Sequence, residues 1–151
     1  MPTFTTKLFN VSRYEALAAY LTGETISVAL VMSNSTAGEE DSAMDFVGDL
    51  TTLDEFDGAN YARKDLANVT IERDDANTRA VLKADNPTWA DLGQGTRDGA
   101  GLLFYVQKTN DADHELLAFV AKTIRADGSD YQFKFDDQPS NGVVIEFKEA
   151  A

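Results

Sequence analysis

Residues 25–32 read Thr-Ile-Ser-Val-Ala-Leu-Val-Met, and this stretch decides the class of fold. Apolar side chains occupy every second position from Ile26 to Met32, and the positions between them are small or apolar. Alternation with a period of two is typical of a β-strand, and the scarcity of polar residues indicates burial. The sequence therefore predicts a largely buried strand over residues 26–32.

A short helix is predicted just before this strand. Ser12 and Glu15 have the spacing of a capping box, in which both side chains bond to backbone N–H groups of the first helical turn. Apolar side chains then recur at helical spacing, at Tyr14, Leu17, Ala18 and Leu21. Gly23 supplies a left-handed stop. We expect an amphipathic helix from Arg13 to about Thr22.

After this point short β-forming segments alternate with turns. Residues 33–58 are polar and acidic, and they predict a long loop, within which Met44, Phe46, Val47 and Leu50 fit a helical turn or an irregular strand. The expected strands after it cover residues 61–66, 69–73, 78–84, 102–108, 115–123, 131–135 and 143–147. A polar turn at residues 74–77 is expected to join 69–73 and 78–84 into a hairpin, and the last turn is expected over residues 136–142. The sequence therefore predicts a mainly β chain of about eight strands, an antiparallel β-sandwich or a jelly-roll-like barrel with one short N-terminal helix. We expect one domain over residues 1–151, with an extended N-terminal arm over residues 1–10.

Composition excludes several classes of protein. A chain of 151 residues suits one domain, and it contains no cysteine for disulfides or thiolate metal sites. Acidic residues number 26 against 13 Lys and Arg, so the formal net charge of −13 repels phosphate and disfavours nucleic-acid binding. No apolar run is long enough to span a bilayer, and residues 1–7 lack the pattern of a secretory signal. We expect a protein that is made in the cytoplasm and has no membrane partner.

No catalytic, cofactor-binding or metal-binding residues are predicted. The only histidine, His114, lies in a predicted turn beside acidic residues, where we expect a solvated side chain. The glycine-rich residues 93–99 lack the spacing of a phosphate-binding loop. Trp89 is expected to be a buried anchor, with a sugar-binding platform as the alternative. With this many acids, pairs at glycosidase spacing arise by chance, so a cell-wall hydrolase remains only a remote alternative.

Three acidic turns leave calcium binding open. They lie at residues 54–58, 74–75 and 127–130. Calcium prefers clusters of carboxylate and carbonyl oxygens, but none of the three turns has the spacing of an EF-hand loop. Asp and Gly also favour turn conformations for their own sake, and we expect that role here.

The order of segments resembles a widespread group of small structural proteins of phages and prophages. The segments that carry the resemblance are the capped helix followed by residues 25–31, then residues 56–63, 69–80, 84–93 and 103–109. In that group a "gly-tyr-ala-arg" strand, a "thr-trp" loop and a "val-tyr-lys" strand recur in this order. Ala59-Asn60 and Gln107 depart from the pattern of the group. The resemblance covers about residues 12–147, and it implies a β-sandwich on the virion, at the head surface or near the tail, without catalytic residues.

The resemblance, the acidic charge and the lack of catalytic motifs lead to an expected function. We expect a virion protein, a decoration (cement) protein bound in many copies to the exterior of the capsid. The expected partners are the major capsid protein and further copies of the chain. The apolar side chains of Phe4, Leu8 and Phe9, or exposed strand edges, are the expected assembly contacts. A tail or fibre-associated protein that contacts host glycan through Trp89 or Tyr105 is the alternative.

Overall fold

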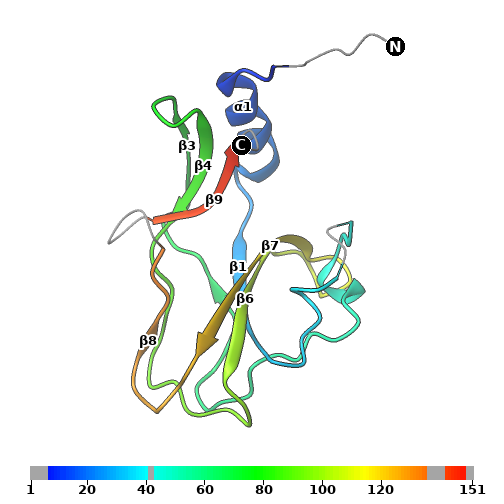
Figure 1. Ribbon diagram of the computed structural model, residues 1–151, viewed down its shortest axis with the longest axis vertical. Helices are drawn as coiled ribbons and strands as arrows, with labels where there is room; N and C mark the ends of the chain where they lie inside the picture. The colour runs from blue at the N-terminus through cyan, green and yellow to red at the C-terminus, as the bar shows by residue number, and fades with distance from the viewer. Residues whose placement is uncertain (1–6, 41–42, 136–141, 149–151) are drawn as a thin grey trace. The chain divides into compact units, whose positions relative to one another are not determined.

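The computed structural model describes residues 7–40, 43–135 and 142–148 (Figure 1). Its internal contacts divide the chain into two compact units. Unit 1 contains the described residues 7–23, 68–85, 135 and 142–148, and unit 2 contains the described residues between 24 and 67 and residues 86–134. The expectation of one domain over residues 1–151 stays a prediction, and the two units are described separately.

Unit 1 is a three-stranded antiparallel sheet with one helix. The sheet has the order β3-β4-β9, formed by β3 (Thr70–Asp74), β4 (Arg79–Ala84) and β9 (Gly142–Lys148). Figure 1 shows β3 and β4 as a hairpin, with β9 running beside β4. Helix α1 (Asn10–Leu21) contacts all three strands, so the predicted amphipathic helix does cover a sheet.

The start of α1 differs from the sequence prediction. The helix begins at Asn10, with Phe9 as its N-cap residue and no side-chain cap. Ser12 lies inside the first turn, where its N–H donates to the Phe9 carbonyl at 3.0 Å. The predicted Ser12–Glu15 capping box is therefore wrong, because the chain turns helical before Ser12 can take the capping position.

The remainder of the helix prediction is confirmed. Leu21 is buried, and the other three residues of the predicted apolar stripe, Tyr14, Leu17 and Ala18, are half-buried. Gly23 has a φ of +83°, which is the left-handed conformation that ends many helices. The turn before β4 contains Thr78 at a φ of +50°, between the two arms of the predicted hairpin.

Unit 2 contains a four-stranded antiparallel sheet with the order β2-β1-β6-β7. Its strands are β1 (Ile26–Met32), β2 (Lys64–Asp65), β6 (Gly99–Val106) and β7 (Glu115–Ile124). A two-stranded antiparallel sheet pairs β5 (Thr88–Trp89) with β8 (Tyr131–Gln132). The long loop is confirmed for the described residues 33–40 and 43–58, apart from the short 3₁₀-helix η1 (Val47–Asp49) and two isolated bridges.

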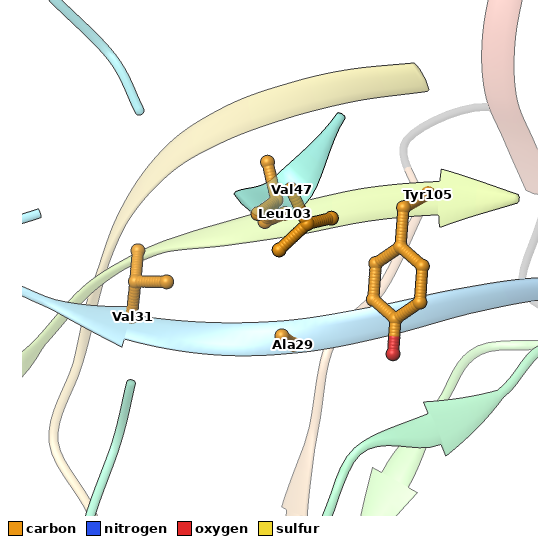
Figure 2. Close-up of a cluster of buried hydrophobic side chains, with 5 residues drawn as sticks. All are labelled: Ala29, Val31, Val47, Leu103 and Tyr105. Atoms are coloured by element: carbon orange, nitrogen blue, oxygen red, sulfur yellow. The ribbon is translucent and has the colours of Figure 1, made fainter. Parts of the chain in front are cut away.

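Strand β1 is the buried centre of unit 2. All seven of its residues are buried, as their apolar sequence predicts, and β1 pairs with β6 along its length. One face of the pair carries a cluster in which η1 adds Val47 to side chains from both strands (Figure 2). The cluster consists of Ala29, Val31, Val47, Leu103 and Tyr105. The long loop therefore covers this face of the sheet.

The predicted fold class is confirmed: the chain is mainly β, its sheets are antiparallel, and it has one N-terminal helix. The described residues form nine strands, against about eight expected, and their sheets do not close into a barrel. The last predicted turn lies mostly outside the described residues, at 136–141. Among the described helices, α1 is the longest at 12 residues, and none is long and apolar enough to cross a membrane.

Candidate functional site

An apolar pocket lies between β7 and the long loop of unit 2. It has a volume of about 220 Å³. Its walls come from β6, from the first half of β7 and from the loop, and the lining residues are Ala37, Glu40, Met44, Leu50, Leu103, Leu116, Leu117, Ala118 and Phe119. An apolar cavity of about 150 Å³ can hold a benzene molecule, so this pocket has room for one large side chain.

The pocket is open to solvent. Leu103 is 3% exposed, whereas the other lining side chains are only partly buried. Phe119 forms part of the floor, where it fits against two glycines: a Cβ atom at Gly101 would collide with the Phe119 ring, and one at Gly38 would come within 2.8 Å of it. The shape of the pocket therefore depends on these glycines, which the sequence analysis left without a role.

Strand β7 forms the edge of the four-stranded sheet. Within the described part of the chain, β6 is its only strand partner. The loop covers the first residues of the outer edge, because Leu116 donates its N–H to the Asp45 carbonyl at 2.9 Å. Between two shifts in the register, residues Ala118–Ala121 pair regularly with β6. A strand edge offers unpaired backbone groups to an incoming strand.

A carboxylate stands at the rim of the pocket. Both oxygens of Glu40 accept the backbone N–H of Thr51, at 3.0 and 3.1 Å. The hydrogen bonds from Thr51 lower the pKa of the Glu40 carboxyl, with a smaller contribution from Thr36. The rim therefore carries a fixed negative charge at neutral pH.

A second polar centre of unit 2 is the Arg63 clamp, formed by Glu55, Arg63 and Asp111. The guanidinium meets Glu55 through Nε at 2.8 Å and Nη2 at 2.9 Å. It meets Asp111 through Nη1 at 2.6 Å and Nη2 at 3.2 Å. The hydroxyl of Tyr61 donates to Glu55 at 2.7 Å and accepts the N–H of Leu30 at 3.1 Å. The clamp joins the long loop, the segment before β2 and the turn before β7.

Arg63 and Asp111 of the clamp keep their charges at neutral pH. The hydrogen bonds to Glu55 and Asp111 raise the pKa of Arg63, and Arg63 in turn lowers the pKa of Asp111. Burial raises the pKa of the Tyr61 and Tyr105 hydroxyls. Each of these shifts moves a group away from neutral pH, whereas general acid–base catalysis favours a pKa near it. This arrangement suits a structural role.

His114 is buried, which corrects the expectation of a solvated turn residue. It is 8% exposed, and its ring stacks on Tyr105 with 4.8 Å between the ring centroids. Its Nδ1 accepts the backbone N–H of Lys108 at 2.8 Å, which places the proton of the neutral ring on Nε2, 3.8 Å from Asp111. No feature of the turn sequence indicated this burial, because it depends on the Tyr105 ring packing from the neighbouring strand.

The residues expected to contact glycan are also buried. Trp89 is 0% exposed, and its indole N–H donates to the carbonyl of Ala62 at 2.8 Å. Tyr105 is 2% exposed within the cluster of Figure 2. The expectation of Trp89 as an anchor is confirmed, whereas a sugar platform built on either ring is wrong in this structure.

The carboxylates of the acidic turns are engaged by neighbouring groups of the chain. Asp54 meets Arg97 Nη2 at 2.6 Å and accepts the N–H of Asn34 at 2.8 Å. In the other two turns Asp74 pairs with Arg79, and Asp127 accepts the N–H of Ser129. No group of three or more metal-ligating side chains occurs within residues 7–40, 43–135 and 142–148. The turn role expected for these residues agrees with the contacts.

The predicted arm contacts fall at the start of α1. Leu8 is 44% exposed and Phe9 is 64% exposed, in a segment with no helix or strand, and Phe4 lies outside the described residues. The ammonium of Lys7 lies 5.3 Å from the centroid of the Phe9 ring, so these two side chains share one side of the segment. The remaining large apolar side chains that are exposed in the described structure are Val11, Tyr20 and Phe147, all in unit 1.

Comparison with known proteins adds no relative: the chain matches no protein-family model, no curated protein and no solved structure. The pocket, the β7 edge and the arm are therefore the features from which a function can be argued.

Proposed function

We propose that this protein is a structural component of a bacteriophage particle, a decoration protein bound in many copies to the exterior of the capsid. The order of its sequence segments supports this reading through the resemblance to phage structural proteins. The net charge of −13 supports a position away from packaged DNA. The proposed partners are the major capsid protein and further copies of the chain.

The exposed arm is the observation that carries the proposal. Two adjacent apolar side chains, Leu8 and Phe9, face solvent at the entrance to α1, where burial would stabilise each by about 1.5–3 kcal/mol. Single apolar residues on a surface are ordinary, whereas two adjacent ones that are both exposed form a candidate contact. In an extended arm, Phe4 and Leu8 point to one side and Phe9 to the other, because side chains alternate along a strand.

The test measures binding to the particle. The double variant Phe4→Ser with Leu8→Ser removes one apolar side of the arm and leaves the helix start at Phe9 intact. We expect it to fold like the wild type and to be depleted from purified phage particles, with Phe147→Thr as a control that removes an exposed apolar side chain outside the arm. Wild-type occupancy of the double variant would contradict the arm as the contact. Recovery of the protein only with separated tails would favour the tail-associated alternative.

A further inference from the structure

We infer that the pocket beside β7 receives the N-terminal arm of a second copy of this chain, with Phe9 as the anchor and Lys7 paired with Glu40. The arm would add a short strand to the free edge of β7, so that the protein self-associates by strand addition. This inference concerns purified copies of the chain and does not rest on the proposed function.

The copy that receives the arm has the two features that strand addition requires. Backbone groups at a sheet edge supply affinity, and a pocket for an alternate side chain supplies specificity. Residues Ala118–Ala121 offer a regular edge, and the first two of them, Ala118 and Phe119, also line the pocket. Its volume of about 220 Å³ suits one phenylalanine or leucine side chain, since about 150 Å³ accommodates benzene.

The arm matches the β7 edge in length, and the order of its side chains matches the pocket and its rim. Residues 4–9 supply six positions for an edge whose regular part has four, from Ala118 to Ala121. Lys7 and Phe9 are two positions apart and therefore lie on one side of an extended segment, as the Lys7 ammonium beside the Phe9 ring shows. Phe9 can enter the pocket while Lys7 lies at its rim.

The charge of the arm suits this pocket better than the charge of the remaining surface does. Residues 1–9 contain Lys7 and no acidic residue, in a protein whose net charge is −13. The carboxylate of Glu40 lines the pocket and is held in place by Thr51. Most other surfaces of a second copy would be repelled, whereas the arm brings a cation to this carboxylate.

The arm is also available for exchange. Leu8 and Phe9 are 44% and 64% exposed, so neither is seated in a pocket of its own chain. Two copies that each insert an arm into the other make the same contact twice, which closes a symmetric dimer.

The test is sedimentation velocity of the purified full-length protein over a range of concentrations. We expect the wild type to self-associate and Phe9→Ser to raise the dissociation constant by about tenfold or more, since a buried phenylalanine anchor is lost. Serine is a favoured N-cap residue, so Phe9→Ser should leave α1 intact. Leu8→Ser is the matched control, and we expect it to associate like the wild type because Leu8 lies on the opposite side of the arm.

Further variants test the pocket that receives the arm. Lys7→Glu and Glu40→Lys should each weaken association, and the double variant should recover it, whereas Glu39→Lys outside the pocket should have little effect. Ala37→Phe fills the pocket and should also block association. A mixture of Phe9→Ser, which keeps its pocket, with Ala37→Phe, which keeps its arm, should form a 1:1 complex. If Ala37→Phe fails to fold, Glu40→Lys takes its place in the mixture.

Two results would overturn the inference. One is a wild type that stays monomeric at the highest soluble concentration. The other is a failure of the variants to discriminate: equal weakening by Phe9→Ser and Leu8→Ser together with no recovery in the charge-reversed double variant.

Discussion

Replacement of Arg63 by methionine should destabilise unit 2, because it leaves the carboxylates of Glu55 and Asp111 close together without their common partner. The guanidinium makes four hydrogen bonds to these two groups, at 2.6–3.2 Å. Removing one partner of a buried ion pair costs about 3–5 kcal/mol, whereas an exposed pair contributes less than about 1 kcal/mol. The side chain of Arg63 is 25% exposed, and those of its partners are 29% and 43% exposed. We therefore expect a loss of about 2–3 kcal/mol, between these limits.

The assay is urea unfolding followed by the fluorescence of Trp89, the only tryptophan of the chain. Trp89 is buried in unit 2 and bonded to Ala62, next to Arg63, so its emission reports on the unit that contains the clamp. For a chain of this size, a loss of about 2–3 kcal/mol corresponds to a fall in melting temperature of about 4–12 °C.

A second variant separates the lost contacts from the unpaired charges. Glu55→Gln and Asp111→Asn remove both carboxylates while keeping side chains of nearly the same shape. Combined with Arg63→Met, they should recover part of the stability, because no uncompensated charge remains. An Arg63→Met protein within about 0.5 kcal/mol of wild type, the range of ordinary surface substitutions, would refute the reasoning. A triple variant less stable than the single one would refute the charge argument.

The remaining predictions concern the clamp at low pH, the pocket floor and metal binding. Because Arg63 lowers the pKa of Asp111, the stability that this pair supplies is complete above the unfolded-state pKa and is lost as the pH falls through the folded-state value. The destabilisation by Arg63→Met should therefore be smaller at pH 3 than at pH 7, and equal values would contradict the assignment. Gly101→Ala should cost about 1–3 kcal/mol in urea unfolding because its Cβ collides with Phe119, and Phe119→Leu should recover part of that loss. Calcium and a chelator should leave the melting temperature of the protein unchanged in calorimetry, since the acidic turns already bind neighbouring groups; a rise with calcium would contradict this.

The class of fold could be predicted because it follows from sequence patterns within short segments. The alternation in residues 26–32 identified β1, and the polar turn before Thr78 identified the β3–β4 hairpin. The helix start was misplaced because the helix begins at Asn10, whose side-chain amide donates to Asp75 at 2.8 Å, a contact between distant parts of the chain that the local capping pattern at Ser12 does not reveal.

The candidate site was harder to foresee because its parts are far apart in the chain. The clamp joins Glu55, Arg63 and Asp111, whose side chains meet only once the long loop has folded over the sheet. The pocket combines four loop residues, Ala37, Glu40, Met44 and Leu50, with β6 and β7. Its floor depends on glycine positions that look like ordinary strand breaks in the sequence. The arm residues Leu8 and Phe9 could be proposed from sequence because apolar residues before a helix start stand out locally.

The most direct test of the proposed function is to look for this protein in purified phage particles from a host that carries its gene, and to locate and count it there by cryo-electron microscopy together with quantitative mass spectrometry. We predict many copies on the outer surface of the head, in a fixed ratio to the major capsid protein. Absence from the particle, or a few copies confined to the tail, would contradict the account.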